Sequence, residues 1–298
     1  MRRPLEIAWK VTAIAAAAWV LDSLLFGLLL GDSSLGGQAA PPGQVGPLSF
    51  LATLILVASL VYPTLRSALA GARLAGALFM AVFGLNVFLV AIEGLVFLHS
   101  LPASDLILLA LCNALTAALV ALLLARTLGG ATRPAEAGTV AADRSGTWWW
   151  SWRIALCSFG YLVLYTAAGM LIWPHVRWFY ESEGLTPDPL VVFPLQIVRG
   201  ALYVVFVLPL LRSLVMRRWQ ASLAMAAMFP VLAGAASLLI PNPVFPDDVR
   251  WLHLVEIAWS NFAYGALVGA LLWNPAAGRR RGDAAAAASD EPEPEPAG

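Results

Sequence analysis

The chain has 298 residues, of which 60% are apolar and 12% charged, and its mean hydropathy is +0.78. Soluble domains carry about 25% charged residues, so this composition excludes a water-soluble globule and indicates a polytopic membrane protein. Eighteen basic residues balance eighteen acidic ones, and the lack of a basic excess argues against a nucleic-acid partner. The expected partner is the lipid bilayer.

Eight apolar runs are long enough to cross a bilayer core, which needs about 20 residues of helix. The first run is too long for a secretion signal and contains Lys10 and Asp22, so we expect an uncleaved helix. The segment after the fourth run is rich in Gly, Ala and Thr, and this composition is typical of a linker. The eight runs are 8–30, 48–67, 74–98, 106–125, 154–174, 190–211, 219–240 and 251–273.

Basic residues gather on one side of the predicted bundle, and positive charge is typical of the cytoplasmic side of a membrane protein. With eight crossings, the opposite loops hold only Arg177 and Arg250, and Arg199 lies within a run. We therefore expect a multi-pass protein of the cell membrane, of the bacterial inner-membrane type, with both termini in the cytoplasm. The 15 residues on the cytoplasmic side are Arg2, Arg3, Lys10, Arg66, Arg73, Arg126, Arg133, Arg144, Arg153, Arg212, Arg217, Arg218, Arg279, Arg280 and Arg281.

The chain matches itself at an offset of about 145 residues, which indicates a duplicated unit. Each unit has four crossings, an even number, so the two copies have the same orientation and an axis along the membrane normal relates them. The predicted fold is all-α, with eight transmembrane helices arranged as two tandem four-helix repeats in the same orientation. The matching segments are 8–11 with 151–154, 62–67 with 208–213, and 112–113 with 260–261.

These runs divide the chain into four parts. The first repeat covers residues 1–127, and a cytoplasmic linker covers 128–151. The second repeat covers 152–275. The remaining segment, 276–298, has an alternation of Glu and Pro that is too polar to fold and predicts a disordered cytoplasmic tail.

Four ionisable residues lie inside the runs and away from their cytoplasmic ends, Asp22, Glu93, Arg199 and Glu256. At a helix centre such a residue costs about 2.5–3.5 kcal/mol. At a rise of 1.5 Å per residue, all four fall in the outer half of the bilayer. Other polar residues lie three or four positions away and so share their helix faces. The predicted intramembrane polar site consists of Asp22, Glu93, Gln196, Arg199, Tyr203, Glu256, Ser260 and Tyr264.

Three acids oppose one arginine in this set, so full ionisation leaves two uncompensated carboxylates in a low dielectric. Such groups take up a proton or attract a cation. From their depths, we expect Arg199 to bridge the two repeats through Asp22 and Glu256. These residues have no ionisable counterpart of the same kind in the other repeat, which favours one composite site. The alternative is that the polar residues only hold the helices together.

A metal site is a further hypothesis. His253 and Glu256 are three residues apart, and with His99 they are the candidate ligands of zinc, iron or manganese. The predicted arrangement of two four-helix halves is similar to the architecture of the haem A synthases. Those proteins bind haem through paired histidines of membrane helices, and this chain has no matching motif. We expect no cofactor, with metal or haem as the alternative.

The chain has no nucleotide-binding loop, H-E-x-x-H zinc motif or G-x-S-x-G elbow, so no catalytic residue is indicated. The favoured function is a transporter or permease for a small solute, coupled to protons or cations through the polar site. The first alternative is a non-catalytic subunit or scaffold with partners in a membrane complex. The second is a membrane-embedded enzyme that binds a metal or haem.

Overall fold

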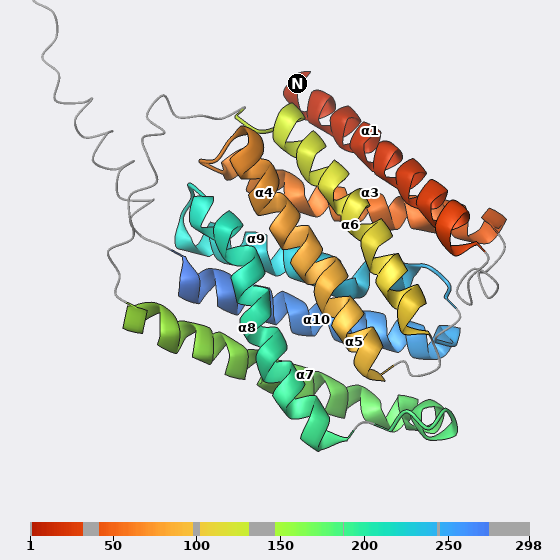
Figure 1. Ribbon diagram of the computed structural model, residues 1–298. Helices are drawn as coiled ribbons and strands as arrows, with labels where there is room; N and C mark the ends of the chain where they lie inside the picture. Colours follow the sequence, from red (N-terminus) through yellow and green to blue (C-terminus); the bar gives the residue numbers. More distant parts are fainter. Residues whose placement is uncertain are drawn as a thin grey trace, which may run out of the picture.

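The computed structural model describes residues 2–31, 42–97, 102–130, 147–186, 188–242 and 245–273, and within these ranges the chain forms helices and no strand. The helices form one elongated bundle (Figure 1). Their bounds are α1 Arg2–Leu25, η1 Phe26–Leu30, α3 Pro42–Arg66, α4 Gly71–Val82, η2 Phe83–Phe88, α5 Leu89–Phe97, α6 Ala103–Thr127, α7 Thr147–Ser182, α8 Pro189–Ser213, α9 Arg218–Pro230, η3 Val231–Ala235, η4 Ser237–Leu239 and α10 Asp247–Leu272.

Seven helical segments of the described chain are long and apolar enough to cross a membrane, as a multi-pass membrane protein requires. They correspond to seven of the eight predicted runs, with ends that differ by a few residues. The largest difference is α7, whose 36 residues begin at Thr147, inside the predicted linker 128–151, and end beyond the predicted limit at residue 174. At 1.5 Å per residue α7 is about 54 Å long and extends past a bilayer core. The predicted tail 276–298 lies outside the described residues.

The predicted run 219–240 is wrong as a single continuous helix. It is divided into α9, a π-helical turn at Val231–Ala235 and a short 3-10 turn. Gly234 has a φ of +122°, a conformation that only glycine adopts easily, so the helical hydrogen-bond ladder stops there. Pro230 adds to the interruption because it has no N–H to donate.

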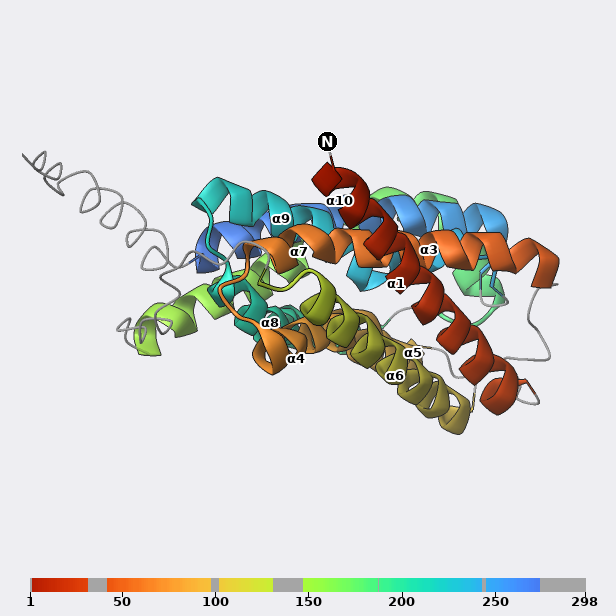
Figure 2. The ribbon, with the colours of Figure 1, turned by 90° about the horizontal axis from the view of Figure 1, so that it is seen from above.

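Helix packing divides the bundle into an N-terminal half, α1 to α6, and a C-terminal half, α7 to α10. In the N-terminal half α1 packs on α3 and α6, and α6 packs on α4. In the C-terminal half α7 packs on α8 and α10, and α10 packs on α9. The halves meet where α4 contacts α8 and α3 contacts α9, in the middle of the bundle (Figures 1 and 2). Each half therefore uses the same pattern of helix contacts.

The loops after α3 and α8 meet at one end of the bundle, which we call the loop-pair end. Ser67 Oγ and Ser213 Oγ are 2.8 Å apart. The backbone N–H of Ala68 donates to the carbonyl oxygen of Ser213 at 2.7 Å. The backbone N–H of Val215 donates to the carbonyl oxygen of Arg66 at 2.8 Å. These two bonds are reciprocal, because each loop gives one N–H and one C=O to the other. The contact closes this end of the interface between the halves.

Small residues allow the closest helix approach, between α9 and α10. Gly265 and Gly269 lie one turn apart on α10 and face α9, and both are buried. A Cβ atom at Gly265 would lie 2.4 Å from the backbone oxygen of Met225. In α6, Ala117 and Ala121 have the same four-residue spacing and are buried as well. Small residues four apart are typical of tightly packed membrane helices.

Candidate functional site

Arg199 is the centre of a buried polar cluster in the C-terminal half. It lies midway along α8, and its side chain is only 3% exposed. Gln196 and Tyr203 lie one turn before and after it on the same face and are fully buried. The predicted polar face of α8 is therefore present and points into the bundle.

The anion that pairs with Arg199 is Glu93 of α5. The two guanidinium nitrogens Nη1 and Nη2 donate to the two carboxylate oxygens, each at 2.8 Å. Nη1 also donates to Gln196 Oε1 at 3.1 Å, and Nη2 to the Tyr203 hydroxyl at 3.4 Å. Bidentate arginine–carboxylate pairs are among the strongest hydrogen-bonded contacts. This pair joins the two halves of the bundle.

The predicted partners of Arg199 were wrong. Asp22 instead accepts a hydrogen bond from Thr116 of α6 at 3.4 Å. Glu256 pairs with His253 on its own helix. Depth along a helix was the only basis for the prediction, and depth does not fix which helices are neighbours. Helix α1 packs on α3 and α6, so Asp22 faces α6 rather than α8.

A second polar chain connects α7 with α10. His253 Nδ1 lies 2.6 Å from Glu256 Oε2, and its Nε2 lies 2.9 Å from the Tyr180 hydroxyl. Both ring nitrogens of His253 therefore have partners, and the side chains of His253 and Glu256 are largely buried. Each ring nitrogen of an imidazole can donate or accept a hydrogen bond according to the tautomer, so this chain of contacts connects a carboxylate to a hydroxyl through one side chain.

Helix α7 packs against α8, which carries Arg199, and against α10, which carries His253 and Glu256. The Tyr165 ring lies one turn after Tyr161 on α7, with 6.3 Å between the ring centroids. One turn further along α7, Gly169 leaves room for the Glu256 carboxylate, whose Oε1 lies 3.8 Å from the position that a Cβ would take. The cluster thus extends from Glu93 to Tyr180 across four helices.

A layer of aromatic rings closes the cluster on the side nearer the loop-pair end. Tyr161 lies 5.0 Å from Tyr203 and 4.9 Å from Tyr264 between ring centroids, and Phe229 lies 5.4 Å from Tyr264. The Arg199 guanidinium is 5.8 Å from the Tyr161 ring, a cation–π distance. Three of the four aromatic residues, Tyr203, Phe229 and Tyr264, are completely buried, so the rings form a packed layer in this conformation.

Two π turns face each other next to the cluster. The turn η2 lies within the continuous helical span Gly71–Val96, and the turn η3 follows α9 and contains the helix break at Gly234. Asn86 of η2 donates from Nδ2 to the carbonyl of Leu232 in η3 at 3.2 Å. Glu93 lies five residues after the end of η2. The geometry of this π turn therefore determines where the Glu93 carboxylate meets Arg199. Single π turns within helices are frequent at functional sites.

Two predicted residues have local roles. Ser260 donates to the carbonyl of Glu256 within α10 at 2.6 Å, and Tyr264 donates to the carbonyl of Gly200 at 2.7 Å, joining α10 to α8.

Conversely, Tyr165 and Tyr180 belong to the cluster but were not among the predicted residues. Tyr180 was missed because the fifth run was ended at residue 174. The i,i+4 pair Arg177–Glu181, at 2.6 Å, is a sequence signal that the helix continues.

The structure does not test the metal-site hypothesis, because one of its three ligands lies outside the described residues. Among the residues that the structure describes, no group of three or more His, Cys, Asp or Glu side chains converges as metal ligands do. His253 and Glu256 are adjacent, but the third predicted ligand, His99, lies outside the described residues. The metal set therefore remains a prediction.

The Arg199 Nε atom is buried and has no hydrogen-bond partner in the described part of the chain. The Nε atoms of Arg153 and Arg250 share this feature, so it is not specific to Arg199. Comparisons of the chain with protein-family models, curated proteins and solved structures find no match.

Proposed function

We propose that the protein is a transporter or permease for a small solute, with proton or cation coupling through the polar cluster. The observation that carries this proposal is the pair of π turns, η2 and η3, that face each other between the halves beside Glu93 and Arg199, with η3 ending at the helix break of Gly234. Many secondary transporters bind solute where broken helices meet at a repeat interface.

In this proposal the segment 218–240 crosses the membrane as an interrupted helix, which makes eight crossings in two tandem repeats. The matching helix contacts of the two halves support the duplication. The reciprocal backbone hydrogen bonds between the loops at Ser67 and Ser213 support it as well. The π turns η2 and η3 also occupy matching positions in the third helix of each repeat. The small residues Ala117 and Gly265, which lie 148 positions apart in the sequence, are both buried in the last helix of their repeat.

The proposed orientation puts the loop-pair end in the cytoplasm, in agreement with the distribution of the basic residues. The described conformation is then closed toward the cytoplasm by the Ser67–Ser213 contact and by the aromatic layer. On the other side of the layer, the Glu93 side chain is 36% exposed. A rocking motion of the halves opens the loop-pair contact and closes the outer side.

Coupling is assigned to the acids that Arg199 does not neutralise. Glu256 exchanges a proton with His253, whose other nitrogen contacts the Tyr180 hydroxyl. Asp22, beside Thr116, is a second proton or cation group at the edge of the N-terminal half. Solute binds beside Arg199, where the unpartnered Nε atom offers a donor.

Two-sided access to Asn86 tests the transporter against a static subunit of a membrane complex. We expect Asn86→Cys, in a background with Cys112→Ala and Cys157→Ala, to react with a membrane-impermeant maleimide from outside in right-side-out vesicles. We also expect it to react from the cytoplasmic side in inverted vesicles, because transport exposes the interface alternately. The control Val255→Cys, on an exposed face of α10, should stay unlabelled in both, because a thiol surrounded by lipid does not ionise. Labelling of Asn86→Cys from one side only, or from neither, would contradict transport.

A further inference from the structure

Arg199 and its neighbour Gln196 on α8 present more hydrogen-bond donors than acceptors. The guanidinium has five N–H donors and no acceptor. Its Nη atoms donate to the Glu93 carboxylate and to Gln196 Oε1. Gln196 is fully buried, and its Nε2 atom has no hydrogen-bond partner in the described part of the chain. A site with a spare buried donor suits a ligand that offers only acceptors, and a carboxylate is such a ligand.

Glu93 is the member of the ion pair that a ligand can replace. Its side chain is 36% exposed, whereas that of Arg199 is 3% exposed. Both Glu93 oxygens bind the same guanidinium, so one movement of the side chain releases both bonds. Arg199 is also bonded to Gln196 and Tyr203, and it stays charged when Glu93 leaves. An incoming anion therefore displaces Glu93.

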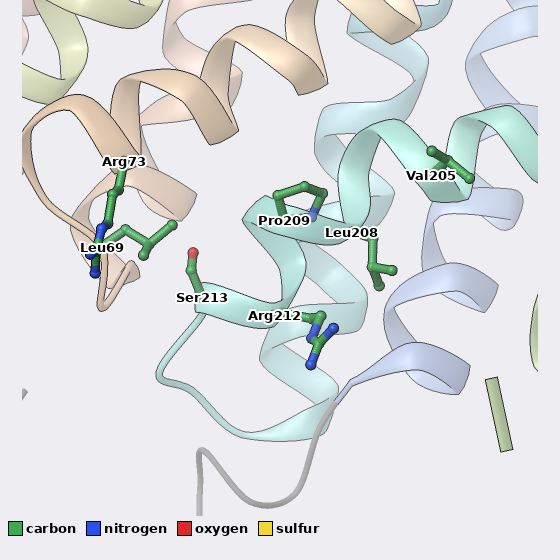
Figure 3. Close-up of a pocket in the computed structure, with 7 residues that line it drawn as sticks. All are labelled: Leu69, Arg73, Val205, Leu208, Pro209, Arg212 and Ser213. Atoms are coloured by element: carbon green, nitrogen blue, oxygen red, sulfur yellow. The ribbon is translucent and has the colours of Figure 1, made fainter. Parts of the chain in front are cut away.

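The position for such a ligand is the one that the Glu93 carboxylate fills, and not the surface groove between the halves. That groove lies near the loop-pair end, where Leu69 and Ser213 line it (Figure 3). It extends along α8 as far as Val205, six residues beyond Arg199, and no residue of the polar cluster lines it. A ligand at Arg199 therefore needs no cavity beyond the space that Glu93 vacates.

We propose that the transported solute is a small monocarboxylate anion, which binds Arg199 in place of the Glu93 carboxylate. This inference rests on the proposed transport function and adds the class of substrate. The solute accepts the two bonds from Nη1 and Nη2, and Gln196 Nε2 is available as a further donor. Glu93 moves toward the side on which it is already exposed. One guanidinium balances one negative charge, so a solute with a single carboxylate leaves no buried charge uncompensated.

Thermal unfolding of the full chain in detergent, with acetate as the probe and chloride at equal ionic strength as the reference, tests this site. We expect acetate to raise the unfolding midpoint of the wild type, by about 5–10 °C at a hundredfold excess over its dissociation constant. Glu93→Ala should reach the same rise at about a tenth of the acetate concentration or less, because no tethered carboxylate competes. Glu181→Ala, which removes an exposed carboxylate from α7, should respond as the wild type does. Arg199→Leu combined with Glu93→Leu should not respond.

The proposal fails if acetate stabilises neither the wild type nor Glu93→Ala, or if the double variant without Arg199 responds as strongly as the wild type. It also fails if inorganic phosphate stabilises the wild type as well as acetate does. This binding test is independent of transport. Two-sided labelling of Asn86→Cys without an acetate response would refute the monocarboxylate and leave transport standing. An acetate response with labelling from one side only would contradict transport of the bound anion.

Discussion

Glu93→Leu should lower the free energy of unfolding by about 3 kcal/mol, because it leaves the Arg199 guanidinium buried without an anion. Arginine stays protonated at any accessible pH, so this side chain cannot escape by becoming neutral. The expected loss lies at the lower end of the range for buried pairs, since Glu93 is 36% exposed. Unfolding by SDS in mixed micelles measures the change.

A double substitution identifies the true partner. Arg199→Leu combined with Glu93→Leu should restore stability to within about 1 kcal/mol of the wild type, because no unpaired charge remains. Arg199→Leu combined with Asp22→Leu should not restore it, because Glu93 then stays unpaired. Arg177→Leu, which breaks the exposed pair with Glu181, should cost less than about 1 kcal/mol. Rescue by Asp22→Leu instead of Glu93→Leu would show that the pairing is wrong.

Gly265→Ala should also destabilise the protein strongly, because the new methyl group meets the backbone of α9 and not a movable side chain. The nearest atoms would be the Met225 oxygen at 2.4 Å and carbonyl carbon at 2.8 Å. Overpacking of this kind costs about 1–3 kcal/mol. Gly269→Ala meets backbone atoms of Ala221 and Ser222 at 2.7 and 2.6 Å, so it should have a similar effect.

The matched control for these two changes is Gly76→Ala. Gly76 is also helical, but a Cβ there has no neighbour within 4 Å. We expect this change to be neutral or to stabilise by up to about 1 kcal/mol, because alanine has the higher helix propensity. Thermal unfolding of the three variants in detergent gives the comparison. If Gly265→Ala were as stable as Gly76→Ala, the close contact between α9 and α10 would not exist.

Hydropathy was sufficient to find the helices, because a membrane span requires about 20 apolar residues whatever its neighbours are. It was not sufficient to find the interruptions. A hydropathy average over residues 219–240 does not detect that Gly234 adopts a φ of +122°. The π turn at Phe83–Phe88 contains Gly84 and Asn86, but it has no proline and no residue with a positive φ, so the sequence does not distinguish it from ordinary helix.

The cost of burying Arg199 predicted that this residue faces the interior and needs an anion, and both features are present in the structure. The identity of the anion was not predictable from depth. Glu93 reaches Arg199 because α5 lies beside α8, whereas α1 carries Asp22 toward α6. Neighbour relations of this kind depend on side-to-side packing, which the sequence of one helix does not contain.

The most direct test of the proposed transport cycle is a reversible lock at the loop-pair end. Ser67→Cys and Ser213→Cys place two thiols where the serine hydroxyls are 2.8 Å apart, so oxidation should join the halves there. In a chain that also carries Asn86→Cys and lacks the native cysteines, we predict that oxidation abolishes maleimide labelling of position 86 from the cytoplasmic side. Labelling from outside should persist, and a reducing agent should restore the cytoplasmic reaction. Cytoplasmic labelling that oxidation leaves unchanged would contradict the account.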